Sequence, residues 1–256
     1  MTLLDPDEIS ARFSPAIIGR KIQVYLETAS TNDVAMRLAR AGASEGIVIF
    51  AESQTAGRGR LGRRWQSAAG RGLWFSVLLR PKWPDFSRVG LAAAVAVARG
   101  VDRFLPEPAG IKWPNDIYLR GDRKTAGILC ESGSGFVVVG IGLNVNHLLD
   151  DFAGEVAHRA TSLALVAGRQ FDRAGVAASV LDEFDRIYGR LPHGFPEIVA
   201  ECERRSVLLG KTVRINGISG TVLGLDPNGG LHLRQDNDRE VVVTAGEISM
   251  LELVPQ

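Results

Sequence analysis

The chain has few of the residues on which metal centres, disulfide frameworks and nucleophilic enzymes depend. It has only two cysteines, Cys130 and Cys202, and no Cys-x-x-Cys pair. This excludes a disulfide framework and fits a reduced, cytoplasmic setting. The four histidines are scattered, so they form no local metal-binding motif, and no Gly-x-Ser-x-Gly nucleophile elbow occurs. Any chemistry must therefore come from placed charges rather than from a side-chain nucleophile.

Long hydrophobic runs are also missing. The alanine- and valine-rich run at residues 91–98 is too short to span a bilayer. The first 13 residues contain Asp5, Asp7 and Glu8 and no basic stretch ahead of an apolar run, so we expect no signal peptide. With 256 residues, 45% of them apolar and 23% charged, the composition is that of a soluble globular protein without a membrane partner. The length allows one large domain, or a large and a small one.

A net charge of only +1 conceals one strongly basic segment. No acidic residue occurs in residues 53–84, which contain Arg58, Arg60, Arg63, Arg64, Arg71, Arg80 and Lys82. At its centre, residues 57–65 read Gly-Arg-Gly-Arg-Leu-Gly-Arg-Arg-Trp. Glycines let backbone N–H groups approach a ligand, arginines grip carboxylate and phosphate oxygens, and tryptophan offers a flat ring. The segment predicts a loop that binds an anionic small molecule.

Other interpretations of this loop fit less well. Gly57, Gly59 and Gly62 match the dinucleotide fingerprint, but that motif needs a helix opening within it and an acid about 20 residues later. Here a second loop and another predicted strand follow, and the first acid is Asp85. The His-Arg-Asp and Asp-Phe-Gly motifs of protein kinases are absent. A pI of 7.8 argues against nucleic-acid binding. A solvated surface loop remains the alternative if the loop is taken alone.

The hydrophobic patterns predict alternating strands and helices up to residue 205. Predicted strands cover residues 21–26, 46–51, 73–79, 109–113, 117–119, 124–131 and 136–145, and predicted helices cover residues 30–40, 85–105, 161–168, 172–191 and 196–205. Ser30 and Asp33 have the spacing of a capping box at the start of the first helix.

After residue 205 the character of the sequence changes. Residues 210–253 contain short β runs separated by turn residues such as Asn216-Gly217, which predicts a small all-β unit, a barrel by its length. We place a boundary near Ser206, giving predicted domains at residues 1–205 and 206–256. The predicted fold class is α+β.

Several short polar motifs accompany the arginine loop. Ser30-Thr31-Asn32 opens a predicted helix, Lys112-Trp113-Pro114-Asn115-Asp116 interrupts a strand, residues 124–129 (Lys-Thr-Ala-Gly-Ile-Leu) begin one, and residues 140–146 (Gly-Ile-Gly-Leu-Asn-Val-Asn) end one. Taken singly, each motif has a structural explanation: a helix cap, a solvated lysine or the end of a strand. Their joint occurrence points to a common site.

With these motifs in this order, the whole chain resembles a biotin protein ligase. The matching patterns are G-R-G-R-x-G-R-x-W, K-W-P-N-D, K-x-A-G-I-L and G-x-G-x-N. The resemblance implies a mixed sheet flanked by helices, followed by a small C-terminal SH3-like β-barrel. Gly246-Glu247-Ile248-Ser249 resembles part of that barrel.

The resemblance implies an ATP-dependent reaction in two steps. The biotin carboxylate attacks the α-phosphate of ATP to give biotinyl-5'-AMP, and a lysine of a biotin carboxyl carrier protein then attacks the mixed anhydride. Mg²⁺ is expected to bridge phosphate oxygens. Two anions must meet, and at about 4 Å two unit charges repel by roughly 4 kcal/mol at an effective dielectric constant near 20, so the arginines and lysines suit this chemistry.

The resemblance also implies roles for individual residues. The catalytic residues would be Lys124, Arg60 and Arg58. Biotin would be bound by Ser30, Thr31, Asn32, Gln54, Gly57, Arg58, Gly59, Arg60, Lys124 and Gly127, with the first three on its ureido ring. The adenylate would be bound by Arg58, Arg60, Arg63, Trp65, Lys124, Asn115 and Asn144, with Trp65 against the adenine. Asp116 is a candidate metal partner.

Two departures and two alternatives stay open at this point. Regulatory members of the family have an N-terminal winged helix, but the first motif here begins at Ser30, so we expect no DNA binding and no repression. Leu61 stands where some members have a further arginine.

The alternatives are a lipoate or octanoate ligase of the same fold and a non-catalytic biotin or nucleotide sensor. Ser30, Thr31 and Asn32 favour a ureido ring, and Lys124 and Arg60 favour an enzyme. A homodimer is compatible with the sequence.

Overall fold

A seven-stranded mixed sheet forms the centre of the protein. The computed structural model describes residues 3–83, 86–191 and 193–250. The sheet has the order β1-β2-β3-β7-β6-β5-β4. Only the β1–β2 pairing is parallel; the other pairs are antiparallel. The strands are β1 (Lys21–Thr28), β2 (Ile47–Gln54), β3 (Gly72–Leu79), β4 (Gly110–Lys112), β5 (Asp116–Leu119), β6 (Arg123–Gly133) and β7 (Phe136–Asn144). The predicted mixed sheet is confirmed.

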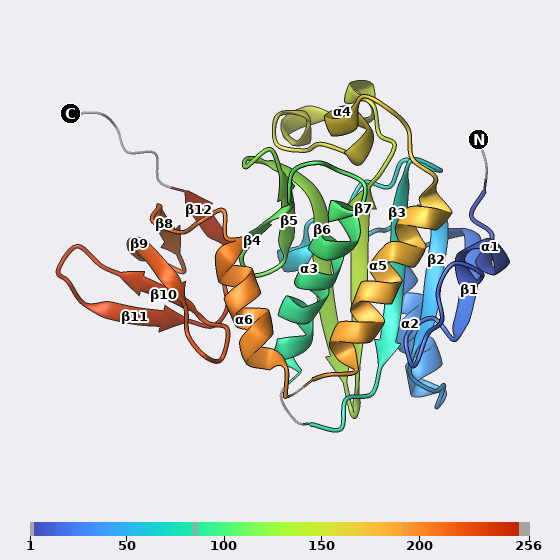
Figure 1. Ribbon diagram of the computed structural model, residues 1–256, viewed down its shortest axis with the longest axis horizontal. Coiled ribbons are helices and arrows are strands. Elements are labelled where there is room, and N and C mark those ends of the chain that lie inside the picture. Colours follow the sequence, from blue (N-terminus) through green and yellow to red (C-terminus); the bar gives the residue numbers. More distant parts are fainter. Residues whose placement is uncertain (1–2, 84–85, 192, 251–256) are drawn as a thin grey trace.

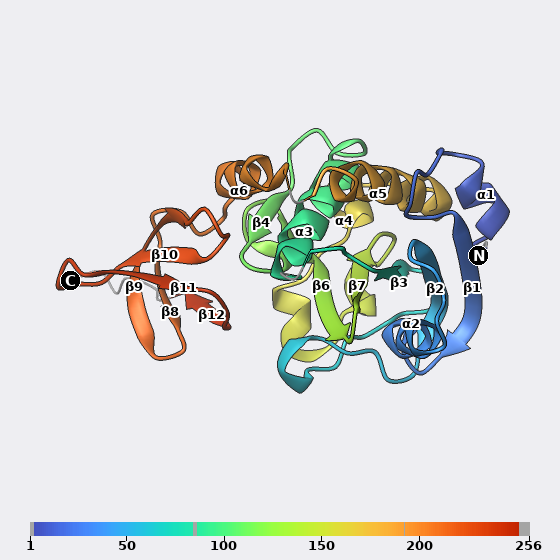
Figure 2. The same ribbon diagram turned by 90° about the horizontal axis from the view of Figure 1, so that it is seen from below.

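Helices cover the two faces of this sheet unequally. The long helices α3 and α5 lie together over one face, while α2 lies on the other (Figures 1 and 2). The helices are α1 (Pro6–Ser10), α2 (Thr31–Arg40), α3 (Ser87–Asp102), α4 (Leu163–Ala167), α5 (Arg173–Tyr188) and α6 (Phe195–Arg204). Short 3₁₀ turns are at Arg60–Gly62, Leu149–Asp151 and Gly154–His158. No helix in the described part of the chain is long and apolar enough to cross a membrane.

The predicted helices agree with the structure except at their ends. The helix predicted for residues 85–105 begins at Ser87, and Asp85 lies outside the described residues. Helix α1 was not predicted, because five residues are too few to show a helical period.

The predicted capping box at α2 is wrong. Ser30 is at the N-cap position, but its side chain makes no capping hydrogen bond. The carboxylate of Asp33 instead binds Arg58. The first-turn N–H of Thr31 donates to Gln54 Oε1 at 2.8 Å. A side chain from β2 therefore satisfies this end of the helix.

Alternation along the strands gives the sheet two different faces. On β3, Phe75 and Val77 belong to the large core shared with α3 and α5, whereas Leu78 belongs to a smaller cluster with α2 residues such as Val34. Ser76, whose side chain contacts Thr31 and Asn32 of α2, also lies on that second face. One face is thus closed by large apolar side chains, and the other is only partly covered by α2.

The C-terminal unit is a five-stranded antiparallel sheet with the order β11-β10-β9-β8-β12. Its strands are β8 (Thr212–Ile215), β9 (Ile218–Leu225), β10 (Leu231–Arg234), β11 (Glu240–Val243) and β12 (Ile248–Met250), which confirms the predicted all-β unit. It lies beside α6 and the β4 edge (Figure 1). Trp113 Nε1 donates to the carbonyl of Gly229 at 2.8 Å. The backbone of Ile111 pairs with Arg205 and Val207. These bonds attach the unit beside the interruption between β4 and β5.

His147, just after β7, is a buried histidine in an aromatic stack. Its ring stacks on Phe152 with a centroid distance of 5.2 Å and meets Trp74 edge-on at 5.5 Å. Nδ1 has no hydrogen-bond partner among the described residues. Burial lowers the pKa of His147 to about 4.

The stability of the protein should therefore fall with pH below the ordinary histidine range. Between pH 6.5 and 4 the unfolded chain binds a proton at His147 that the folded protein excludes, so the free energy of unfolding should drop by about 3 kcal/mol over that interval. Urea unfolding at several pH values tests this. His147→Phe, which preserves the stack, should remove this part of the pH dependence. If the free energy of unfolding of the variant still falls with pH as steeply as that of the wild type, His147 is not the group responsible.

Candidate active site

The arginine loop folds back on itself over the sheet face opposite α3 and α5 (Figure 2). Trp65 N donates to the carbonyl of Gly57 at 2.9 Å, and Gly59 N donates to that of Arg63 at 2.7 Å. The turn between them uses positive φ at Leu61 (55°) and Gly62 (73°). The loop is therefore a compact hairpin, and the dinucleotide interpretation fails because no α-helix opens within it.

Trp65 lies on a glycine floor made by β6 and β7. A Cβ added to Gly142 would be 2.5 Å from Trp65 Cε2, and one added to Gly127 would be 2.8 Å from Cζ3. Trp74 meets the Trp65 ring edge-on at 6.2 Å. Any side chain at either glycine would displace the indole, so the floor exists only because these positions lack one.

Lys124, from the start of β6, stands beside this floor. Its Nζ lies 5.3 Å from the Trp65 ring centroid and 2.6 Å from Asp116 Oδ1, an ion pair between neighbouring strands. Lys112 is close by. Burial lowers the pKa of its ammonium, and the Asp116 carboxylate opposes part of that shift. The structure thus brings two predicted polar motifs, from residues 112–116 and 124–129, to the tryptophan of the loop.

Arg60 joins the loop to two other segments. It donates to Asn115 Oδ1 at 2.9 Å and to the carbonyl of Gly246 at 3.2 Å. Asn115 is itself held by a 2.8 Å bond from Nδ2 to the Ile128 carbonyl. Arg63 forms an ion pair with Glu247. The loop tip is therefore tied to the C-terminal unit, 186 residues further along the chain.

Arg58 points elsewhere. Its guanidinium forms two hydrogen bonds to Asp33, at 2.8 and 2.7 Å, and lies 3.1 Å from Glu131 Oε2. The hydrogen bond to Asp33 raises the pKa of Arg58, and the same bond lowers the pKa of Asp33. In this structure the side chain joins α2 to β6.

Ser30, Thr31 and Asn32 are buried at the start of α2, beside Gln54 at the end of β2. Thr31 N donates to Gln54 Oε1, and Asn32 Nδ2 donates to Glu131 Oε2 at 2.6 Å. The structure thus gathers these four predicted residues at one end of the glycine floor.

Comparison with known proteins decides the family. The sequence model of the Biotin/lipoate A/B protein ligase family matches residues 26–146, and that of the Biotin protein ligase C terminal domain matches residues 208–251. The chain is 36% identical over 244 residues to the biotin--[acetyl-CoA-carboxylase] ligase of Mycobacterium tuberculosis, covering 90% of this chain and 88% of that protein. This chain belongs to the biotin protein ligase family.

Other relatives agree with this assignment. The bifunctional ligase/repressor BirA of Bacillus subtilis is 36% identical over 254 residues, covering 94% of this chain and 78% of that protein. The structure of the biotin protein ligase from Aquifex aeolicus in complex with biotin and ATP matches with a TM-score of 0.81 and 32% identity, covering 91% of this chain and 99% of that one.

Sequence reasoning assigned no role to some residues that support the polar cluster at Thr31 and Asn32. Ser76 contacts both Thr31 and Asn32, and Gly140 lies so close to Asn32 that an added Cβ would be 2.2 Å from its Oδ1. Glu131 is the third, since it contacts both Asn32 and Arg58. Ser76 had a signal, because it is the one polar residue in the apolar run 73–79. The contact between Glu131 of β6 and Asn32 of α2 left no signal in the sequence.

Asn144 differs from its expected surroundings. Its Nδ2 donates to the carbonyl of Thr161 at 3.0 Å, and its own carbonyl accepts from Thr125. The side chain is buried and holds the segment before α4. Contact with a nucleotide stays a prediction for this residue.

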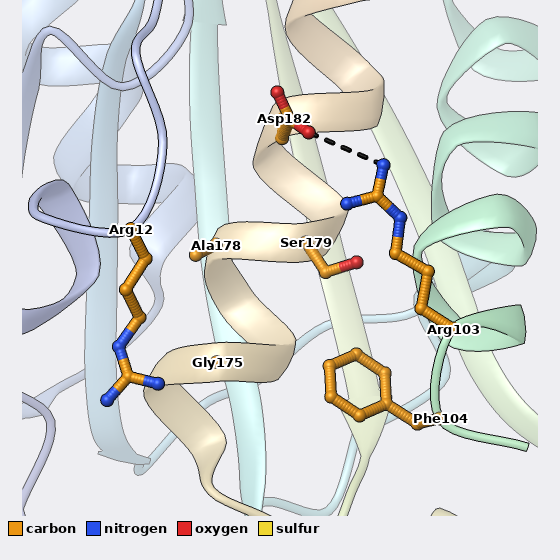
Figure 3. A pocket seen from close by; sticks show the side chains of 7 residues that line it. All are labelled: Arg12, Arg103, Phe104, Gly175, Ala178, Ser179 and Asp182. Carbon is orange, nitrogen blue, oxygen red and sulfur yellow. Dashed lines mark hydrogen bonds and ion pairs between the residues drawn. The ribbon is translucent and has the colours of Figure 1, made fainter.

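A separate hollow lies among the helices on the covered side of the sheet (Figure 3). It is lined by Arg12, Arg103, Phe104, Gly175, Ala178, Ser179 and Asp182. Arg103 faces Asp182 at 3.4 Å, and Arg12 pairs with Asp172. None of the predicted site residues lines this hollow.

Breaking the ion pair between Arg63 and Glu247 should loosen the loop. Both side chains are largely exposed, so the pair contributes about 0.2–1 kcal/mol, and Glu247→Gln should speed tryptic cleavage after the loop arginines by a factor of about 1.4 to 5. Mass spectrometry of timed digests measures this. Glu240→Gln, which alters a pair with His232 on the same unit, is the matched control. Equal rates in both variants would contradict the link.

Proposed function

We propose that this protein is an ATP-dependent ligase that activates biotin as biotinyl-5'-AMP and transfers it to a lysine of a biotin carboxyl carrier protein. The observation that best supports this is the convergence of Lys124, Arg60 and the buried polar cluster at Thr31 on one glycine floor. Family membership agrees with it, as does the likeness to the Aquifex ligase described with biotin and ATP.

In the first step, a carboxylate oxygen of biotin attacks the α-phosphorus of ATP, and the bond to the β-phosphate oxygen breaks as pyrophosphate leaves. Lys124 lies between the two anions and stabilises the charge that builds on the phosphorus oxygens. Arg60 adds a second cation from the loop. In the second step, the carrier lysine attacks the acyl carbon, and AMP leaves with the electron pair of the broken C–O bond.

The ureido ring is bound at the far end of the floor by Ser30, Thr31, Asn32 and Gln54. Gly127 and Gly142 provide the flat surface for the fused rings. Trp65, whose ring lies against Gly142 and Gly127, borders this surface and packs against the adenine. Gly57 and Gly59 then bring their backbone N–H groups to the acyl phosphate.

The remaining nucleotide contacts come from Asn115, Asn144 and Arg63. Arg58 is already paired with two carboxylates, which favours a role in holding α2 against β6 over direct contact with phosphate.

Mg²⁺ fits the site when it binds together with the phosphates of ATP. Nowhere in the described ranges do three His, Cys, Asp or Glu side chains gather to hold a metal ion. Mg²⁺ is usually bound by one or two carboxylates together with substrate phosphates, and Asp116 is the carboxylate beside Lys124. When bound, the ion would neutralise phosphate charge.

Biotin-dependent exchange of labelled pyrophosphate into ATP tests the proposal directly. Exchange that requires biotin supports it, and no exchange with Mg²⁺, ATP and biotin would overturn it. Lipoate in place of biotin tests the lipoate ligase, and calorimetric biotin binding without turnover would indicate a sensor. Cytoplasmic location, a homodimer and the absence of nucleic-acid binding belong to the same proposal.

Removing the Lys124 ammonium should affect chemistry more than binding. Lys124→Ala is expected to slow adenylation about 10²–10³-fold, the cost of one donor that stabilises developing charge, while the biotin Kd changes less than about tenfold. Single-turnover formation of biotinyl-5'-AMP and calorimetry measure the two quantities. Lys211→Ala, a change outside the site, is the control. Equal losses in rate and affinity would indicate a structural lysine.

Shortening Arg60 should release the reactive intermediate. Arg60→Gly removes the bonds to Asn115 and Gly246, so the loop covers biotinyl-5'-AMP less well and its escape should rise about tenfold. Biotin on the lysines of an added bystander protein reports escape. Arg64→Gly, which removes a bond to Thr55 within the loop, is the control. Bystander labelling at the wild-type level would contradict the covering role.

A further inference from the structure

Ser76 lies directly behind the residues that face the ureido ring. It is fully buried on β3, and its Oγ is 2.7 Å from Thr31 Oγ1 and 2.5 Å from Asn32 Oδ1. Gly140 makes this cluster possible, because a Cβ there would be 2.2 Å from Asn32 Oδ1. A serine hydroxyl has one proton, so it can donate to only one of its two neighbours.

The other end of the cluster decides which neighbour receives that proton. Glu131 faces the guanidinium of Arg58 at 3.1 Å, and an ionised carboxylate only accepts hydrogen bonds. The Asn32 group that lies 2.6 Å from Glu131 must therefore be its Nδ2, which turns Oδ1 towards Ser76. At 2.5 Å this oxygen requires a donor, so Ser76 donates to Asn32.

Thr31 is then left with one consistent arrangement. Since the Ser76 proton is used on Asn32, the short contact between the two hydroxyls needs the proton of Thr31, and Thr31 donates to Ser76. Its longer 3.2 Å contact with Gln54 Oε1 is the weaker competitor for that proton. That oxygen already accepts from Thr31 N at 2.8 Å, so Gln54 Nε2 remains a donor.

We propose that Ser76 and Glu131 are positioning residues that fix the direction of this hydrogen-bond chain, so that Thr31 Oγ1 presents a lone pair and Gln54 Nε2 presents an N–H to the ligand. A cyclic urea has the complementary groups, N–H donors beside a carbonyl acceptor. This rests on the proposed function, since biotin is the cyclic urea concerned. Neither residue touches the substrate; both act through Thr31 and Asn32.

The proposal predicts a change in selectivity rather than in chemistry. The probes are the two cyclic carbamate analogues of biotin, in each of which a ring oxygen replaces one ureido N–H. The wild-type protein should disfavour the analogue whose ring oxygen faces Thr31 Oγ1 by at least about tenfold in kcat/KM for pyrophosphate exchange. In that analogue the ring oxygen and the lone pair of Thr31 Oγ1 would be two acceptors facing each other. In Ser76→Ala the Thr31 hydroxyl loses its acceptor, and in Glu131→Met the Asn32 amide loses the acceptor that orients it, so the Thr31 hydroxyl can reverse and the preference should shrink to about threefold or less.

Matched variants separate positioning from general loss of stability. Ser179→Ala removes a buried serine that bonds the Gly100 carbonyl, and Glu183→Met alters a paired glutamate on the same helix. Both should keep the wild-type preference, and kcat for biotin should stay within about threefold in all four variants. Glu131→Met keeps the length of a partly exposed side chain while removing its acceptor oxygens, so it keeps the test valid if Ser76→Ala folds poorly.

The outcomes are distinguishable. Narrowed selectivity in Ser76→Ala and Glu131→Met, with the controls unchanged, supports the proposal. Wild-type selectivity in Glu131→Met, or an equal narrowing in Ser179→Ala and Glu183→Met, overturns it while leaving the ligase assignment intact. A wild-type protein that exchanges pyrophosphate with none of the three compounds overturns the proposed function and this inference together.

Discussion

The close approach of side chains to glycine backbone on one face of the sheet is the constraint on which the site depends. Asn32 packs against Gly140, and Trp65 packs against Gly142 and Gly127 at distances that no Cβ would allow. The opposite face is filled by large apolar residues under α3 and α5. This division gives the protein a rigid, closed side for stability and a side with space for flat and polar groups.

The positive charge of the loop is balanced by groups from distant segments. Arg58 meets Asp33 and Glu131, while Arg63 meets Glu247 in the C-terminal unit. These contacts explain how a segment without any acid can lie close to the sheet in a chain of net charge +1. They also place the C-terminal unit in contact with the loop.

The agreement between sequence and structure follows the range of the interactions involved. Strand β3, residues 72–79, was predicted almost to the residue because a run with a single polar residue, between a glycine-containing loop and a proline-containing one, has few alternatives. The capping box at Ser30 was wrong because the carboxylate of Asp33, which a capping box needs, binds Arg58, 25 residues away along the chain. Glu131 was missed for a similar reason, since its role depends on the packing of α2 against β6.

The sequence by itself determined the family, the order of elements and the chemical types gathered in the site, because motifs and periodicity are local properties of the chain. Only the tertiary structure decided which groups pair with which. It directed Arg58 to carboxylates, joined Arg60 to Gly246 and placed Ser76 between Thr31 and Asn32. Hydrogen bonds have direction and reach only about 3 Å, so their partners depend on how separate strands and helices pack, and no pattern along the chain contains that information.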